Sequence, residues 1–103
     1  MTDRIRLDVD QLVIGRRDPD AGHFPDIDLT HHHPDDPHLS RRHARVLRRA
    51  GGWIVEDLSG NAATWLNDRA HLLDREVATL SHGDRILVSD SVVLRFDAGT
   101  LPP

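Results

Sequence analysis

The chain has 103 residues, which is enough for one domain and too few for two. Its formal net charge of -4 argues against general affinity for nucleic acid or for anionic membranes, and no apolar run approaches the roughly 18 residues of a membrane-spanning helix. There is no cysteine, which excludes disulfides and thiolate metal sites, and the N-terminus lacks a signal-peptide pattern, so we expect a cytoplasmic protein.

Short strand patterns with turn residues between them dominate the chain. We expect about eight to ten strands, a spacing typical of a β-sandwich or barrel. No segment keeps one apolar helical face. The clearest predicted strands are, in chain order, Gln11–Ile14, Ile27–Leu29, Ala44–Arg48, Trp53–Leu58, Thr64–Leu66, Glu76–Leu80, Arg85–Val88 and Val92–Phe96, with a hairpin turn at Gly51-Gly52.

Three longer polar loops, at residues 16–25, 30–39 and 59–63, are the expected place for function. All 13 basic residues are arginine, and they cluster at residues 16–17 and 41–49. Arginine suits bidentate contacts with carboxylate or phosphate. A negative chain with basic loops therefore indicates a specific anionic ligand.

Three segments stand out together: Ile14-Gly15-Arg16, then residues 39–44 with the sequence LSRRHA, then residues 57–67, followed by Gly83-Asp84-Arg85-Ile86. Their order and spacing resemble the forkhead-associated (FHA) domain, over about Leu12 to Phe96. The resemblance implies an all-β, eleven-stranded FHA-type sandwich whose loops at one end bind phosphothreonine peptides. We expect residues 1–103 to form one domain with its core at about 12–96, and 97–103 to be a tail or the start of a linker.

Phosphate carries close to two negative charges and strong acceptor oxygens, so it needs fixed donors. Arg16 offers a guanidinium, Ser40 a hydroxyl, and Arg41 a charge or a backbone N–H. The resemblance implies that Gly15 and His43 support these loops. Two simpler interpretations stay open: Arg16 pairs with a nearby carboxylate such as Asp18 or Asp20, and Ser40 caps a turn.

The third segment departs from the family pattern, which usually has Asn-Gly-Thr with a second Asn three residues later. Here Ala62 and Ala63 stand where that Asn and Gly are expected, followed by Thr64 and Asn67. We expect these four positions to border the peptide and Asn61 to face the phosphate. Ala62 has no amide to hold the peptide, and alanine adopts positive φ less easily than glycine. The departure predicts weakened binding.

The His31-His32-His33 run lies near Asp35, Asp36 and His38, and histidine with carboxylate can bind zinc or nickel. Consecutive histidines cannot easily point at one ion, and the spacing matches no catalytic metal motif. We therefore expect no physiological metal site, only incidental metal capture.

The leading hypothesis is a signalling module that recognises phosphothreonine in a partner protein, which we expect to be a Ser/Thr kinase or a kinase substrate. The alternative is an FHA-fold scaffold or assembly domain with weakened or lost phosphate-dependent binding. No nucleophile elbow, paired-carboxylate pattern or phosphate-cradling loop is present, so we expect neither an enzyme nor a cofactor. Few aromatic residues and a negative charge also disfavour nucleic acid.

Overall fold

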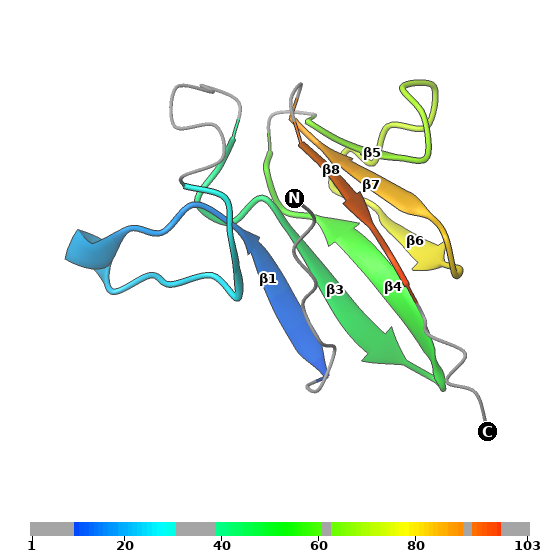
Figure 1. Cartoon of the computed structure of the whole chain (residues 1–103), viewed down its shortest axis with the longest axis horizontal. Coiled ribbons are helices and arrows are strands. Elements are labelled where there is room, and N and C mark those ends of the chain that lie inside the picture. Colours follow the sequence, from blue (N-terminus) through cyan, green and yellow to red (C-terminus); the bar gives the residue numbers. More distant parts are fainter. Residues whose placement is uncertain (1–9, 31–38, 61–62, 90–91, 98–103) are drawn as a thin grey trace.

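The computed structural model describes residues 10–30, 39–60, 63–89 and 92–97, and these form two β-sheets that face each other (Figure 1). The larger sheet has the strand order β2-β1-β3-β4-β6, and the smaller has the order β5-β7-β8. β1 and β2 are parallel, and every other pair is antiparallel. The strands are β1 (Gln11–Gly15), β2 (Ile27–Asp28), β3 (Ala44–Arg49), β4 (Gly52–Asp57), β5 (Thr64–Leu66), β6 (Val77–Leu80), β7 (Arg85–Val88) and β8 (Val92–Arg95).

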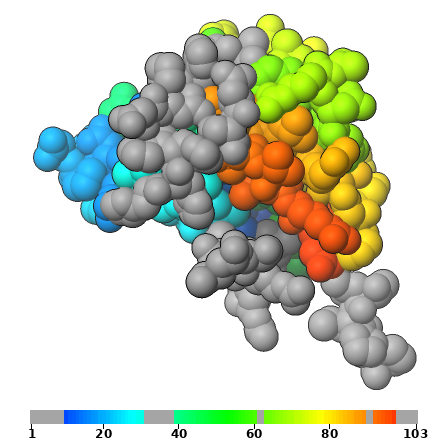
Figure 2. Space-filling view, turned by 45° about the horizontal axis from the view of Figure 1, so that its top comes forward, coloured from blue at the N-terminus to red at the C-terminus, as the bar shows by residue number. Residues whose placement is uncertain are grey.

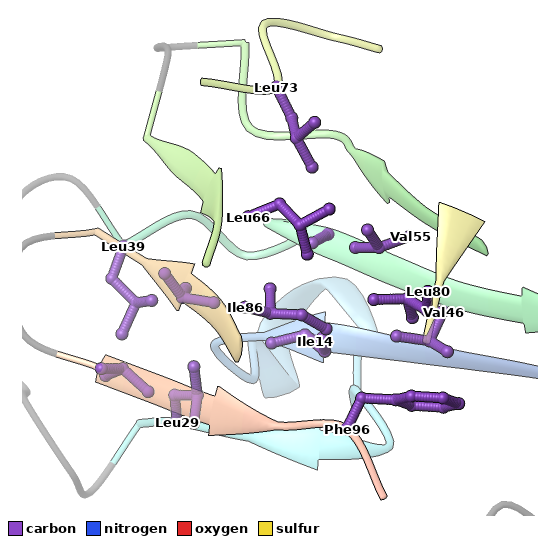
Figure 3. Packing of buried hydrophobic residues seen from close by; sticks show 13 residues of the cluster. Ile14, Leu29, Leu39, Val46, Val55, Leu66, Leu73, Leu80, Ile86 and Phe96 are labelled. Carbon is purple, nitrogen blue, oxygen red and sulfur yellow. The ribbon is translucent and has the colours of Figure 1, made fainter. Parts of the chain in front are cut away.

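Alternation along each strand sends one set of side chains between the sheets. In the larger sheet Leu12 lies opposite Val46, and Val46 lies opposite Val55. In the smaller sheet Leu66 lies opposite Ile86. These rows meet in one hydrophobic core (Figure 3). The fully buried residues Ile14, Leu39 and Val55 and the nearly buried Leu29, Leu73 and Phe96 belong to it.

The hairpin between β3 and β4 forms where the glycines predicted it, shifted by one residue. Arg49 pairs with Gly52, so Ala50 and Gly51 are the two turn residues. Their φ angles of 49° and 80° are both positive, which matches the twist of a two-residue hairpin.

Eight strands are present among the described residues, and not the eleven implied by the family resemblance. One reason lies between β5 and β6, where Asn67 adopts a positive φ of 68° and ends β5. The N–H of Asp68 then turns back to the carbonyl of Leu66, and the side chain of Asp68 accepts from the N–H of Ala70. The chain continues in turns, with one isolated bridge between Trp65 and Leu72.

The helical structure in the described part of the chain is a single 3-10 turn, Pro19–Ala21, in the loop between β1 and β2. No helix there is long and apolar enough to cross a membrane. Because β1 and β2 are parallel, the loop between them must reverse direction before β2 begins. This loop projects from one end of the sandwich (Figure 1). That loop and residues 39–43 lie at the same end.

Candidate functional site

Gly15 allows two segments to meet at the end of β1. A Cβ atom on this residue would lie 1.8 Å from the carbonyl oxygen of Arg41, so no larger residue fits without moving the backbone. The loop before β3 packs directly on the glycine. As a result the N–H of Arg16 donates to the carbonyl of Ser40 over 3.2 Å. The sequence-predicted pair Arg16 and Ser40 is therefore brought together.

His43 supports this junction from beneath and is fully buried. Its Nδ1 accepts a hydrogen bond from the N–H of Ser40 at 3.1 Å. Its Nε2 therefore carries the proton and donates to the carbonyl of Ala63 at 2.7 Å. The backbone N–H of His43 donates to Ile14 at 2.9 Å. One imidazole thus connects β1, the loop before β3 and the start of β5, a supporting position rather than a reactive one.

Three donors at the junction have no partner among the described residues. The Nε of Arg16 is buried without a hydrogen bond, and the Arg16 guanidinium makes no ion pair there. The backbone groups of Ser40 are both bonded, but its hydroxyl is not. The N–H of Arg41 also lacks an acceptor in this part of the structure. Buried donors without partners are costly, so such a group is the expected signature of a site that an anion completes.

The guanidinium of Arg41 is differently placed, because it forms an ion pair with Asp18. This hydrogen bond is the main reason why the pKa of Asp18 lies below its usual value. The ring Nε2 of His23 lies 2.8 Å from the carbonyl of Arg41. These two contacts attach the β1–β2 loop to the loop before β3. Asp18 therefore pairs with Arg41, and not with Arg16 as the simpler interpretation allowed.

Arg17, adjacent to Arg16, is directed to other residues. Its Nε lies 3.8 Å from a carboxylate oxygen of Asp28, and its N–H donates to the hydroxyl of Thr30 at 3.0 Å. Burial alone would raise the pKa of Asp28, but hydrogen bonds from Thr30 and the charge of Arg17 outweigh it and lower the pKa. Of the two neighbouring arginines, Arg16 alone is left to meet a ligand.

An open pocket of about 360 Å³ is lined by His23, Ser40, Arg41 and Arg42. Arg42 is exposed and has no partner among the described residues. Sequence reasoning missed His23. Its contact with Arg41 spans 18 residues and depends on how the β1–β2 loop folds, which no local pattern reports.

Asp57, the last residue of β4, collects hydrogen bonds from three other residues. Asp57 accepts hydrogen bonds from the hydroxyl of Thr64 at 2.7 Å, from Ser59 and from the N–H of Arg75. Burial alone would raise the pKa of Asp57, but these hydrogen bonds outweigh it, so that the pKa is lowered. The carboxylate therefore stays charged and organises the start of β5.

Two residues expected to border the peptide point inward. Ala63 and Thr64 are both buried, and the carbonyl of Ala63 accepts from His43 and from the N–H of Ser89. Ala63 has no positive φ, whereas Gly60 has a φ of 69°. The glycine that this loop needs is therefore Gly60, and alanine at position 63 causes no backbone strain. Asn61 and Ala62 lie outside the described residues.

Asn67 lies at the end of β5 opposite to Thr64. Its side chain donates to Asp84 at 3.2 Å and accepts from the N–H of Arg85 at 2.9 Å. Both ends of the amide are engaged, and they tie β5 to the turn before β7. The structure does not bring Asn67 to Arg16 and Ser40.

Within the described residues no group of three or more histidines and carboxylates is placed to hold a metal ion. The histidines at positions 31–33 and 38, with Asp35 and Asp36, lie outside these residues.

Comparisons with known proteins agree with the fold. The family model of the FHA domain matches residues 12–89. The FHA domain of an Arabidopsis thaliana hypothetical protein is similar, with 23% identity and a TM-score of 0.64 over 90% of this chain and 72% of that one. The FhaA FHA domain, solved in complex with the intracellular domain of Rv3910, has 21% identity and a TM-score of 0.64 over 87% of this chain and 84% of that one.

A third similar structure is Mycobacterium tuberculosis EmbR in complex with a low affinity phosphopeptide, with 28% identity and a TM-score of 0.66. The match covers 93% of this chain but 22% of EmbR, so the chain corresponds to about a fifth of that protein. Among curated proteins none is similar enough to match.

Proposed function

The chain belongs to the FHA domain family, and on this premise we propose that it binds phosphothreonine in a partner protein. The Arg16 guanidinium, the Ser40 hydroxyl and the N–H of Arg41 would hold the phosphate, with Asn61 beside them. FHA domains are phosphopeptide-binding modules and not enzymes, and we infer no catalytic activity and no cofactor for this one.

The observation that carries this proposal is the buried Nε of Arg16, which has no hydrogen-bond partner among the described residues, on a residue whose backbone is bonded to Ser40. Folding has left donors open at one point while satisfying the groups around them. A hydrogen bond to a charged group contributes about 1.5–3 kcal/mol. Three such bonds, after the costs of association, correspond to an affinity of order micromolar, which suits a reversible signalling contact.

The peptide itself would cross the pocket beside Ser40, where His23 and Arg42 lie. The segment from Asn61 to Thr64 would border the peptide on its other side, and Asn67, which is bonded to Asp84 and Arg85 at the far end of β5, would support that strand. Since the side chains of Ala63 and Thr64 point inward, their part would be to shape the loop, and Ala62 supplies no amide. We therefore place most of the affinity on the phosphate side.

The partner would be a phosphothreonine-containing protein such as a Ser/Thr kinase or its substrate. The phosphopeptide complex of the similar EmbR supports a ligand of this class. The net charge of -4 supports neither nucleic acid nor an anionic membrane as the partner.

The test is a calorimetric titration with an oriented phosphothreonine peptide library, its phosphoserine counterpart and its unphosphorylated counterpart. We expect binding with phosphothreonine, a sharp fall with phosphoserine and loss with Arg16→Ala or Ser40→Ala. Arg17→Ala is the matched control, because it removes the same charge from the next residue in the chain. The side chain of Arg17 lies beside Asp28. This variant should bind almost as the wild type does.

Equal binding of the unphosphorylated library would contradict the proposal. It would favour the alternative of a scaffold or assembly domain. That alternative is suggested by Ala62-Ala63, which stand where the family usually has Asn-Gly. Retention of a partner by the Arg16→Ala protein would point the same way.

A further inference from the structure

The outer face of the smaller sheet carries a continuous row of apolar side chains. Leu72 bridges to Trp65, Trp65 lies opposite Leu87, and Leu87 lies opposite Val93. Residues directly opposite each other in antiparallel strands share one face of the sheet. The neighbouring row, which begins at Leu66, faces the core, so this row faces outward. Val93 is 59% exposed and Leu72 is 39% exposed.

Three arginines lie beside this row. The guanidinium of Arg69 stacks on the ring of Trp65 at 4.2 Å from the centroid. Arg85 and Arg95 lie opposite each other on β7 and β8, two residues beyond the pair Leu87 and Val93 and on the same face.

None of these three arginines pairs with a carboxylate in the described part of the chain. Arg69 donates to the carbonyl of Ser89 and Arg85 to the carbonyl of Asn67, while Arg95 makes no such bond there. The strands β5, β7 and β8 contain no acidic residue. Within the residues that the structure describes, the face therefore combines exposed apolar area with arginines that have no carboxylate partner.

The outer face of the larger sheet is different. There Arg45 on β3 forms an ion pair with Glu56 on β4 and a hydrogen bond with Gln11 on β1. Arg45 is therefore paired with a carboxylate on its own sheet, as is usual on a solvated face. In the space-filling view β7 and β8 lie at the surface (Figure 2).

We propose that the row Leu72, Trp65, Leu87 and Val93 with its flanking arginines, here called the arginine-flanked row, docks a protein segment that presents apolar side chains bordered by carboxylates. Aromatic residues and arginine are the residue types enriched in protein interfaces, and charge complementarity sets the partner. A second copy of this chain fits poorly, because a two-fold contact would set the arginines of one copy against those of the other.

This surface lies on a different sheet from Gly15 and Arg16, so it goes beyond the proposed function. A domain with both sites would hold a phosphorylated segment at its loops and a second, unphosphorylated segment on its sheet. Loss of either site would leave the other intact.

The experiment selects an unphosphorylated random peptide library displayed on phage against the full-length chain carrying Arg16→Ala, which silences the proposed phosphate site. We expect the selected peptides to be enriched in Asp and Glu together with Leu, Ile and Phe. Synthetic copies should shift the amide signals of β5, β7 and β8. The triple variant Arg69→Gln, Arg85→Gln, Arg95→Gln should bind them at least tenfold more weakly. The control variant Arg48→Gln, Arg49→Gln, on the larger sheet, should bind unchanged.

Circular dichroism would establish that the triple variant is folded. Selection of no peptide, selection without an acidic bias, or equal binding by the triple variant would overturn the proposal. Self-association at micromolar concentration that Trp65→Ser abolishes would also overturn it, in favour of a dimer. None of these outcomes depends on whether the wild-type chain binds phosphothreonine.

Discussion

Two groups of residues near the loops, one between β1 and β3 and one between β4 and β5, differ in how their polar groups are hydrogen-bonded. On the β1–β3 side, here called the open side, Arg16, Ser40 and the N–H of Arg41 have donors without a partner among the described residues. On the β4–β5 side, here called the closed side, Asp57 accepts hydrogen bonds from Thr64 and its neighbours. The difference favours the open side as the place where the proposed ligand binds and the closed side as its support.

Gly15→Ala should have the largest effect on this arrangement. The new methyl would overlap the carbonyl oxygen of Arg41, and backbone on both sides resists movement. We expect the free energy of unfolding to fall by more than about 3 kcal/mol, with loss of phosphopeptide binding. Urea denaturation and calorimetry measure the two effects.

Gly52→Ala is the matched control, because a methyl there would meet its nearest atom at an ordinary 3.8 Å. It should change stability little. If Gly15→Ala were as stable as Gly52→Ala, the close approach that places Arg16 beside Ser40 would be disproved.

His43→Ala should come next, because His43 joins the open side to the closed side. The variant removes the acceptor of the partly buried N–H of Ser40 and one donor to the buried carbonyl of Ala63. We expect a loss of about 2–3 kcal/mol in the free energy of unfolding. His71→Ala removes an exposed histidine and should be nearly neutral. Similar stability of the two variants in urea would show that the hydrogen bonds of His43 to Ser40 and Ala63 do not contribute to the free energy of unfolding.

The sequence was a good guide to the sheets. Alternation of apolar residues predicted β1, β3, β4, β5, β7 and β8 closely, since each has one face in the core. Arg16 and Ser40 were selected through the resemblance to the FHA domain, and the structure places their backbones in contact, while their binding role stays a prediction.

The closed side was harder to predict, and the reason is physical. A threonine or an asparagine in a loop can face a ligand or its own chain. Thr64 contacts Asp57 of β4, and Asn67 contacts Asp84 in the turn before β7. Both carboxylates come from other parts of the chain. The Asp18–Arg41 pair spans 23 residues and depends on the path of the β1–β2 loop. Sequence spacing carries no information on such contacts.

Acid should lower the free energy of unfolding through protonation of Asp57. Its pKa is lowered in the folded state, so the charged carboxylate stabilises the fold at any pH above its unfolded pKa of about 3.9. That contribution is lost as the pH falls through the lower folded pKa. We expect the urea midpoint of the wild type to decline below about pH 4, and Asp57→Asn to lose about 1–2 kcal/mol at pH 7 with a flatter acid limb.

Asp74→Asn is the control for this titration, because Asp74 is exposed and makes no bond with the other described residues. Its pH profile should follow that of the wild type. An acid limb unchanged by Asp57→Asn would mean that Asp57 is not what keeps the β4–β5 side closed.

The smallest effect concerns Asp18, the carboxylate that pairs with Arg41. Its ion pair with Arg41 is exposed, and such pairs are weak. Asp18→Asn should free the Arg41 guanidinium for the phosphate and raise phosphopeptide affinity about two- to fivefold. Asp20→Asn removes an equal charge two residues away without releasing Arg41. Calorimetric titrations in low salt should show a gain for Asp18→Asn and little for Asp20→Asn. Equal gains would mean that general repulsion of phosphate, and not competition for Arg41, is the effect of this loop.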